Sequence, residues 1–328
     1  MTVASLPDTN LLQIDAAAET ESIAAAIREI VLTRFRRKGA VVAVSGGIDS
    51  SVVASLCVRA LGAENVIVLF LPETDSSGES LRLGKLLSSQ LGVRAFEENI
   101  SAILEGAGCY RRRDEAICAV VPEFGPGYKS KIVLPNMVAA DTYAVFSLVV
   151  QSPAGETKKL RLPLDSYLGI VAASNFKQRT RKMMEYYYAD RYHYAVAGTP
   201  NRLEYDQGFF VKNGDGAADF KPIAHLYKSQ VYQLAAYLNV PDEIQRRPPT
   251  TDTYSLEQSQ EEFYFSMPLA KMDICLYGKD HGITPAELAP IAGFTEEQVK
   301  RAYQMIDSKR RVARYLRDEP VLVQPVSE

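Results

Sequence analysis

The chain has 328 residues, 47% of them hydrophobic and 23% charged, which is an ordinary composition for a soluble globular protein. Its net charge of −3 gives no overall attraction to nucleic acid or to an anionic membrane, so a polyanionic ligand needs a local basic site. No stretch approaches the roughly 18 uncharged apolar residues of a membrane helix. Neither nucleic acid nor a membrane is therefore expected as a partner.

Cysteine usage and the first residues bear on location. Cys57, Cys109, Cys118 and Cys275 form no C-x-x-C pair, which disfavours a zinc site or a dithiol redox site. The segment Met1–Asp15 lacks the basic start and apolar block of a secretory signal. We therefore expect a reducing, cytoplasmic environment.

The first part of the chain alternates helices and buried strands. Apolar residues at helical spacing over 23–35 end at Arg36–Gly39, and the unbroken apolar run Ala40–Val44 predicts a strand buried on both faces. The elements expected next are a helix over 52–61, a strand over 66–71, a helix over 80–91 and a strand over 93–96. This alternation predicts a doubly wound, mostly parallel α/β sheet of the Rossmann type.

The alternation breaks between about 101 and 174, which we interpret as an inserted subdomain. It holds a turn-rich stretch over 122–131 and two β-like runs over 143–151 and 158–162. Because these runs flank Pro153–Gly155, they predict a hairpin.

A helix over 176–191 and a strand over 194–197 then resume the pattern. We expect a single domain over 1–328, with a core at about 38–100 and 175–252 and a helical C-terminal region at about 253–328. Further helices are predicted over 226–238, 287–291, 296–306 and 309–316.

A loop rich in glycine and serine, Ser45–Ser51, joins the strand at 40–44 to the next helix. The start of a helix offers unpaired N–H groups and a partial positive charge, which suit a phosphate. Gly46 and Gly47 allow close approach of the backbone and a positive φ without a Cβ clash. The loop is therefore a candidate phosphate site.

The side chains of this loop refine the prediction. Ser45, Ser50 and Ser51 add hydroxyl donors, whereas the Asp49 carboxylate repels phosphate unless a divalent cation lies between them, which implies Mg²⁺. No lysine stands where the Walker loop G-x-x-x-x-G-K-[ST] needs one. The loop instead resembles the S-G-G-x-D-S signature of the PP-loop ATP pyrophosphatase superfamily. That resemblance implies an adenine nucleotide alpha hydrolase-like fold and cleavage of ATP between its α and β phosphates.

The second half of the chain resembles the ammonia-dependent NAD synthetase family of that superfamily. Its blocks Asn175–Arg181, Gly198–Glu204, Gly208–Asp219, Leu226–Val231 and Pro248–Asp252 are similar to the family's N-x-K-A-R-x-R, G-T-x-N-x-x-E, G-F-F-T-K-Y-G-D-G-x-x-D, L-Y-K-T-x-V and P-P-[ST]-A-D-L. The resemblance is good over 41–71 and 175–252 and absent over 101–174. It implies that ATP adenylates the carboxylate of deamido-NAD and that ammonia displaces AMP.

The resemblance also implies roles on the ATP side. Asp49 and Glu204 would hold Mg²⁺ in an oxygen-rich site. Lys228 and Thr250 resemble residues that hold the ATP phosphates, and Thr199 resembles one that contacts the nucleotide. Asp49 and Lys228 are the residues expected to carry the chemistry, because a cation near the α-phosphate stabilises the charge of adenylation.

Residues on the acid side are assigned in the same way. Arg179 resembles a substrate contact, and Lys212 and Asp215 resemble residues that recognise the nicotinate end of the acid. Asp219 and Lys309 are expected on the same side of the site.

The acid side also departs from the family pattern. Gln260 stands at an acidic position, Ser308 at a histidine, Lys182 at a methionine and Gln178 at an alanine. An amide ligase of the same family that acts on a different acid in specialised metabolism is therefore an open alternative. A non-catalytic nucleotide sensor is a third hypothesis, although it has no need for a metal pair.

The source of nitrogen and the oligomeric state follow from the family by analogy. Residues 1–39, which precede the first strand, leave no room for a glutaminase domain, so we expect free ammonia or ammonia from a separate glutaminase. The resemblance implies a homodimer.

Overall fold

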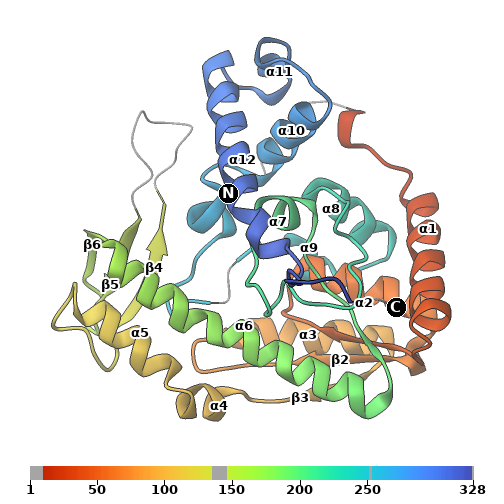
Figure 1. Ribbon diagram of the computed structural model, residues 1–328, viewed down its shortest axis with the longest axis horizontal. Helices are drawn as coiled ribbons and strands as arrows, with labels where there is room; N and C mark the ends of the chain where they lie inside the picture. The colour runs from red at the N-terminus through yellow and green to blue at the C-terminus, as the bar shows by residue number, and fades with distance from the viewer. Residues whose placement is uncertain (1–9, 135–145, 251–252, 327–328) are drawn as a thin grey trace.

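The computed structural model describes residues 10–134, 146–250 and 253–326 (Figure 1). The beginning of the predicted hairpin, residues 143–145, lies outside the described residues. The same holds for residues 1–9 of the N-terminal segment and for the last two residues of the Pro248–Asp252 block.

The core of the protein is a sheet of four parallel strands, as the alternating pattern predicts. The strands are β1 (Ala40–Ala43), β2 (Val66–Phe70), β3 (Arg94–Glu97) and β7 (Ala195–Val196), in the order β3-β2-β1-β7. Because β2 and β7 flank β1 on opposite sides, the order of the strands reverses at β1. Ligands of open α/β sheets bind at such a point, outside the carboxyl ends of the strands.

Helices cover both faces of this sheet, and strand residues alternate between two cores. Val42 and Val68 pack with α1 (Ala16–Arg28), α2 (Ile48–Leu61), α3 (Gly78–Leu91) and α8 (Lys228–Tyr237). Val41 and Ile67 pack on the other face with α4 (Ser101–Gly106) and α6 (Leu164–Tyr192). A π-helical stretch, Glu29–Arg34, continues α1, and α9 (Asp242–Arg246) follows α8. The doubly wound arrangement is confirmed.

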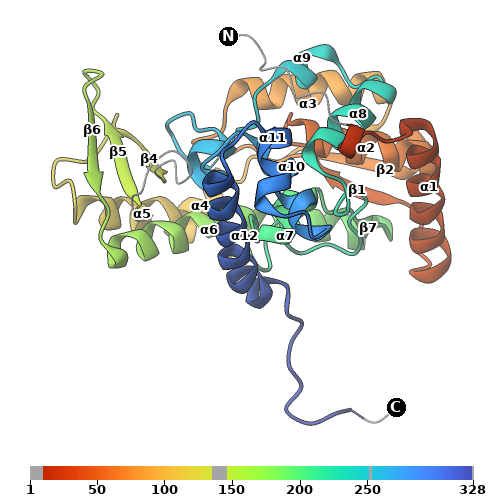
Figure 2. The same cartoon turned by 90° about the horizontal axis from the view of Figure 1, so that it is seen from above.

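A second sheet lies at the other end of α6, on the opposite side of the molecule from α1 (Figures 1 and 2). It is antiparallel and contains β4 (Lys129–Val133), β5 (Ser147–Gln151) and β6 (Thr157–Arg161). The pairing of β5 with β6 confirms the predicted hairpin. The helix α5 (Cys109–Cys118) precedes this sheet, and Ile117 shares a small core with Ile132 and Ile170.

Helix α6 begins at Leu164 and not at residue 176, so the prediction of its start was wrong. Its first half packs with the β4–β6 sheet, through Ile170, and its second half packs with the central sheet, through Tyr188 and Ala189. Two cores therefore contact different halves of one 29-residue helix, and the half that packs with the β4–β6 sheet lies in the stretch that was interpreted as the insertion. The helix runs without interruption through residue 174, where the insertion was expected to end.

The C-terminal region is helical, with α10 (Leu269–Asp280), α11 (Pro285–Ala292) and α12 (Glu296–Arg317) preceded by a π-helical turn, Glu261–Phe265. The two helices predicted over 296–306 and 309–316 are one. In the sequence, the polar pair Asp307 and Ser308 resembles a break between two helices, but both residues lie on the exposed face of α12. Within the described part of the chain, no helix is long and apolar enough to cross a membrane.

Candidate functional site

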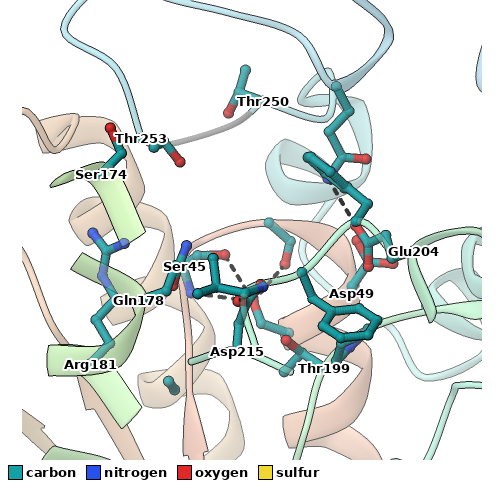
Figure 3. A pocket seen from close by; sticks show the side chains of 18 of the residues that line it. Ser45, Asp49, Ser174, Gln178, Arg181, Thr199, Glu204, Asp215, Thr250 and Thr253 are labelled. Carbon is teal, nitrogen blue, oxygen red and sulfur yellow. Dashed lines mark hydrogen bonds between the residues drawn. The ribbon is translucent and has the colours of Figure 1, made fainter. Parts of the chain in front are cut away.

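A cavity of about 840 Å³ lies beyond the carboxyl ends of the central strands. Its walls come from the β1–α2 connection, from α6, from the segments 208–215, 247–250 and 253–254, and from α12. Figure 3 shows Asp49 and Glu204 close together on one side, and Ser174, Gln178 and Arg181 of α6 on the other. The cavity joins segments that are far apart in the sequence.

The start of α2 is open to the cavity. The helix begins at Ile48 and not at residue 52, so Asp49, Ser50 and Ser51 belong to its first turn. The hydroxyls of Ser50 and Ser51 donate to the carbonyl oxygen of Gly47 at 3.1 and 2.8 Å. Gly47 is the N-cap residue and has no side chain that could cap the helix. Amides of the first turn are therefore available to an anion.

The conformation of this loop depends on Gly46, which has φ +72°. A Cβ at this position would lie 2.4 Å from the carbonyl oxygen of Ser80, so the loop packs directly against α3. Arg247 fixes the same contact, because its Nη2 donates to Ser80 Oγ at 2.9 Å. Sequence analysis missed Arg247, although it stands directly before the Pro248–Asp252 block. It lines the cavity and supplies local positive charge for a polyanion.

The two predicted metal ligands, Asp49 and Glu204, are held by Asn201. The Asn201 Nδ2 donates to Asp49 Oδ1 at 2.9 Å, and its backbone N donates to Glu204 Oε2 at 3.1 Å. Glu204 is not in a loop but is the third residue of α7 (Arg202–Gln207), where it completes a capping box with Asn201. Sequence analysis missed Asn201, although the spacing N-x-x-E before a helix is a capping signal.

A buried cation completes this cluster. Lys228, whose side chain is 3% exposed, forms an ion pair with Asp49. Burial lowers its pKa, but the carboxylates of Asp49 and Glu204 outweigh that effect and raise it above the ordinary value. Burial, reinforced by the charge of Asp49, raises the pKa of Glu204 to about 8. Gln260 Nε2 donates to Glu204 Oε1 at 3.0 Å, so the residue at the family's acidic position is a neutral donor here.

The donor set fits a cation that is shared with a ligand. Among the described residues, no group of three or more His, Cys, Asp or Glu side chains could hold a metal ion. Mg²⁺ is usually bound through one or two carboxylates together with waters and the phosphates of the substrate. Asp49 and Glu204 are such a pair, beside a helix start that suits phosphate.

The other residues predicted on the ATP side are divided between the cavity and the loop behind it. Ser45, Thr199 and Thr250 line the cavity, as do Gly47, Asp49, Ser50, Glu204 and Lys228. Gly46 and Ser51 are not part of the lining, and they shape the loop through their backbone and hydroxyl contacts.

Three residues predicted on the acid side, Arg179, Lys212 and Asp215, also line the cavity. Arg179 Nε donates to the carbonyl oxygen of Lys212 at 3.3 Å. Lys212 Nζ donates to the carbonyl oxygens of Tyr315 and Asp318 at 2.8 and 3.1 Å, so the end of α12 closes over it. Burial raises the pKa of Asp215, whose Oδ1 accepts from the backbone N of Val211.

Asp219 and Lys309, both among the described residues, do not belong to the lining of the cavity. Asp219 joins β7 to α6, because it accepts from the backbone N of Val196 at 2.7 Å and from the Tyr186 hydroxyl at 3.1 Å. Lys309 Nζ donates to the carbonyl oxygen of Tyr264 at 2.5 Å, and burial lowers its pKa to about 7. Both residues therefore have structural partners in this state.

Behind the α6 wall lies an ion cluster that sequence analysis did not identify. Lys177 Nζ donates to Glu73 Oε1 at 2.9 Å, to Asp75 Oδ2 at 2.7 Å and to the carbonyl oxygen of Thr253 at 2.8 Å. Arg113 also pairs with Asp75. The cluster ties α6 to the strand end after β2 and to the loop that carries Thr253 into the cavity wall. Its only signal in the sequence is the position of Lys177 in the N-x-K-A-R-x-R block.

Known proteins that are similar to this chain over most of its length carry the same family name. A sequence model described as NAD synthase matches residues 19–115 and 159–314. A protein from Rhizobium meliloti named NH(3)-dependent NAD(+) synthetase is 59% identical over 97% of this chain and 95% of its own length. A protein of the same name from Mesorhizobium japonicum is 55% identical over 97% of this chain and 100% of its own length.

The similarity extends to solved structures. The NH3-dependent NAD synthetase from Campylobacter jejuni has a TM-score of 0.60 at 22% identity, over 95% of this chain and 100% of that one. At this identity the likeness shows the shared fold.

Proposed function

The chain belongs to the NAD synthase family, and on this premise we propose that it converts deamido-NAD, ATP and ammonia to NAD, AMP and pyrophosphate. The enzyme is a ligase that forms a carbon–nitrogen bond. The observation that carries the proposal is one cavity in which an open helix start adjoins two carboxylates and a buried lysine. The names of the relatives at 53–59% identity favour deamido-NAD over the alternative of a different acid.

On the ATP side, the first-turn amides of α2 and the Ser45 and Ser50 hydroxyls bind the phosphates that leave as pyrophosphate. Asp49 and Glu204 would hold Mg²⁺, which supplies charge neutralisation on the phosphates when bound. The Lys228 ammonium stabilises the negative charge that develops at the α-phosphate. Thr199 and Thr250, from two further walls, orient the nucleotide.

On the acid side, the carboxylate of the nicotinate ring attacks the α-phosphorus in line, and the bond to pyrophosphate breaks. Arg179, Lys212 and Asp215 hold the ring end of the acid so that its carboxylate faces the phosphorus. Ammonia then attacks the acyl carbon of the adenylate, and AMP leaves. No side-chain nucleophile is needed, so catalysis rests on positioning and on electrostatic stabilisation.

The active form is a homodimer in the cytoplasm. The homodimer is supported by two pairs of exposed apolar side chains on α6, Leu164 with Leu168 at its start and Met183 with Tyr187 nearer its end, which are 49–68% exposed. Such exposure is typical of a surface that another chain covers.

The cytoplasmic location is supported by the four cysteines, all of which are free thiols.

The purified chain is expected to use ammonium salts and not glutamine. With Mg-ATP, deamido-NAD and ammonium chloride, NAD and AMP should form in equal amounts, and turnover should rise with pH as NH₃ is released from NH₄⁺. Product analysis by chromatography checks this, with glutamine as the alternative nitrogen donor. The acids to compare are nicotinate mononucleotide, free nicotinate and aspartate. No pyrophosphate release with deamido-NAD, but release with another acid, would overturn the assignment of the substrate.

Lys212→Met is expected to lower kcat/KM for deamido-NAD by roughly 10- to 150-fold, because one charge-assisted hydrogen bond to the acid is lost. The KM for ATP should change less than about twofold, since the ATP loops lie on another wall. Steady-state kinetics with each substrate varied in turn checks whether the loss is confined to deamido-NAD. Lys300→Met, on the exposed face of α12, is the control. An equal loss for both substrates would contradict an acid-binding role.

A further inference from the structure

A buried carboxylate of the C-terminal region contacts the start of α8. Asp273 belongs to α10 and is completely buried. Its Oδ1 accepts from the backbone N of Lys228 at 3.2 Å, and its Oδ2 accepts from the backbone N of Ser229 at 2.7 Å. Both oxygens are therefore used on the first two amides of α8.

This contact replaces the usual local cap. The N-cap residue of α8, Tyr227, forms no capping bond through its side chain, and its hydroxyl has no partner among the described residues. Most helices satisfy these amides with a Ser, Thr, Asp or Asn of their own chain segment. Burying a carboxylate from another helix is costly unless it is fully hydrogen-bonded. Asp273 therefore supplies, from another helix, the acceptors that these two amides would otherwise lack.

The residue whose backbone Asp273 holds is the buried lysine of the cavity. The backbone of Lys228 is fixed by Asp273, and its ammonium pairs with Asp49, so the side chain is held at both ends. The negative charge of Asp273 also lies at the positive end of the α8 dipole. Burial raises the pKa of Asp273 to about 6, so the carboxylate is ionised at neutral pH and accepts at both oxygens.

We propose that Asp273 is a positioning residue for the ATP reaction: it anchors the first turn of α8 so that the Lys228 ammonium stands at the α-phosphate. The inference rests on the proposed function of Lys228. It assigns the C-terminal helices a part in catalysis, although α10 itself contributes no residue to the described lining of the cavity. A displacement of about 1 Å costs catalysis on the order of 100-fold, so the anchor need move only slightly to matter.

Asp273→Asn tests this role, because it keeps the shape but replaces one of the two accepting oxygens with an NH₂ group, which can only donate. We expect kcat/KM for Mg-ATP to fall by roughly 10- to 100-fold. The effect on the KM for deamido-NAD should stay within about threefold. Affinity for Mg-ATP, measured by calorimetry without the acid, tests the anchor independently of the overall reaction. If the wild-type chain binds Mg-ATP but releases no pyrophosphate with any acid, the proposed function fails while the anchor can still be judged.

A double-mutant cycle with Lys228→Met separates positioning from general stability. If Asp273 acts through Lys228, then Asp273→Asn adds no further loss of kcat/KM in the Lys228→Met background. A full additional loss in that background would overturn the proposal. Should Asp273→Asn fail to fold, Asp273→Ser keeps one acceptor and enters the same cycle.

Thr284→Ala is the matched control for losing a helix cap. Thr284 caps α11 in the same C-terminal region and is not part of the described cavity lining. Its loss should lower the melting temperature while kcat/KM for Mg-ATP stays within about twofold of the wild type. If Asp273→Asn behaves in the same way, lowering the melting temperature alone, Asp273 is a structural cap and the proposal is wrong.

Discussion

Asp49→Asn is expected to lower pyrophosphate release by roughly 1,000-fold or more, because the site loses the charge that balances the cation on the phosphates. The amide keeps the size of the side chain and can still accept from Asn201, so the loss reports on charge and not on shape. A coupled assay of pyrophosphate at several Mg²⁺ concentrations checks this. Binding of Mn²⁺ with ATP, followed by electron paramagnetic resonance, gives a second readout without turnover.

The same substitution should change stability little. Removing Asp49 leaves Lys228 with Glu204 as its counter-charge, and the pKa of Glu204 falls once Asp49 no longer opposes its ionisation. We expect a shift of melting temperature below about 2 °C, corresponding to about 1 kcal/mol in a chain of this size. Asp242→Asn, on a side chain that is 73% exposed, is the control. Near-normal turnover of Asp49→Asn at saturating Mg²⁺ would show that Asp49 is not a metal ligand.

Lys228→Met has the second largest expected effect, a loss of about 100- to 1,000-fold in kcat, since one preorganised charge at the reacting phosphate disappears. The apolar stem of methionine fills the space of the lysine stem, so packing is kept. Lys228→Arg should restore only a part of the rate, because a planar guanidinium does not fit the place of the compact ammonium that pairs with Asp49. Single-turnover measurements of AMP formation check the chemical step directly.

The Lys228→Met variant also makes a prediction about the metal pair. Without the cation, Asp49 and Glu204 face each other unbalanced, so binding of Mg²⁺ should stabilise this variant more than it stabilises the wild type. Thermal denaturation with and without Mg-ATP measures the difference. Lys279→Met, which removes a partly exposed ion pair between Lys279 of α10 and Asp307 of α12, is the control. Equal rates for Lys228→Met and Lys279→Met would exclude a catalytic role for Lys228.

Sequence patterns were sufficient for features that depend on neighbouring residues. Ala40–Val44 is apolar without alternation, because a parallel strand is buried on both faces, and this pattern predicted β1. The loop Ser45–Ser51 could be assigned to phosphate because its glycines, hydroxyls and carboxylate stand together in the chain. The hairpin of β5 and β6 followed from two β-like runs around Pro153–Gly155. In each case the determining residues lie within one short segment.

The sequence by itself determined the α/β class, the phosphate loop and the family blocks that carry Asp49, Glu204 and Lys228. The tertiary structure alone decided that Asn201 joins the two carboxylates and that Asp273 anchors Lys228 from 45 residues away. It also placed Asp219 and Lys309 against structural partners. The reason is physical: a local pattern records the period and chemistry of one segment. Which distant side chains meet is settled by how α6, α8 and α10 pack, because a buried charge takes whatever partner that packing brings within hydrogen-bond distance.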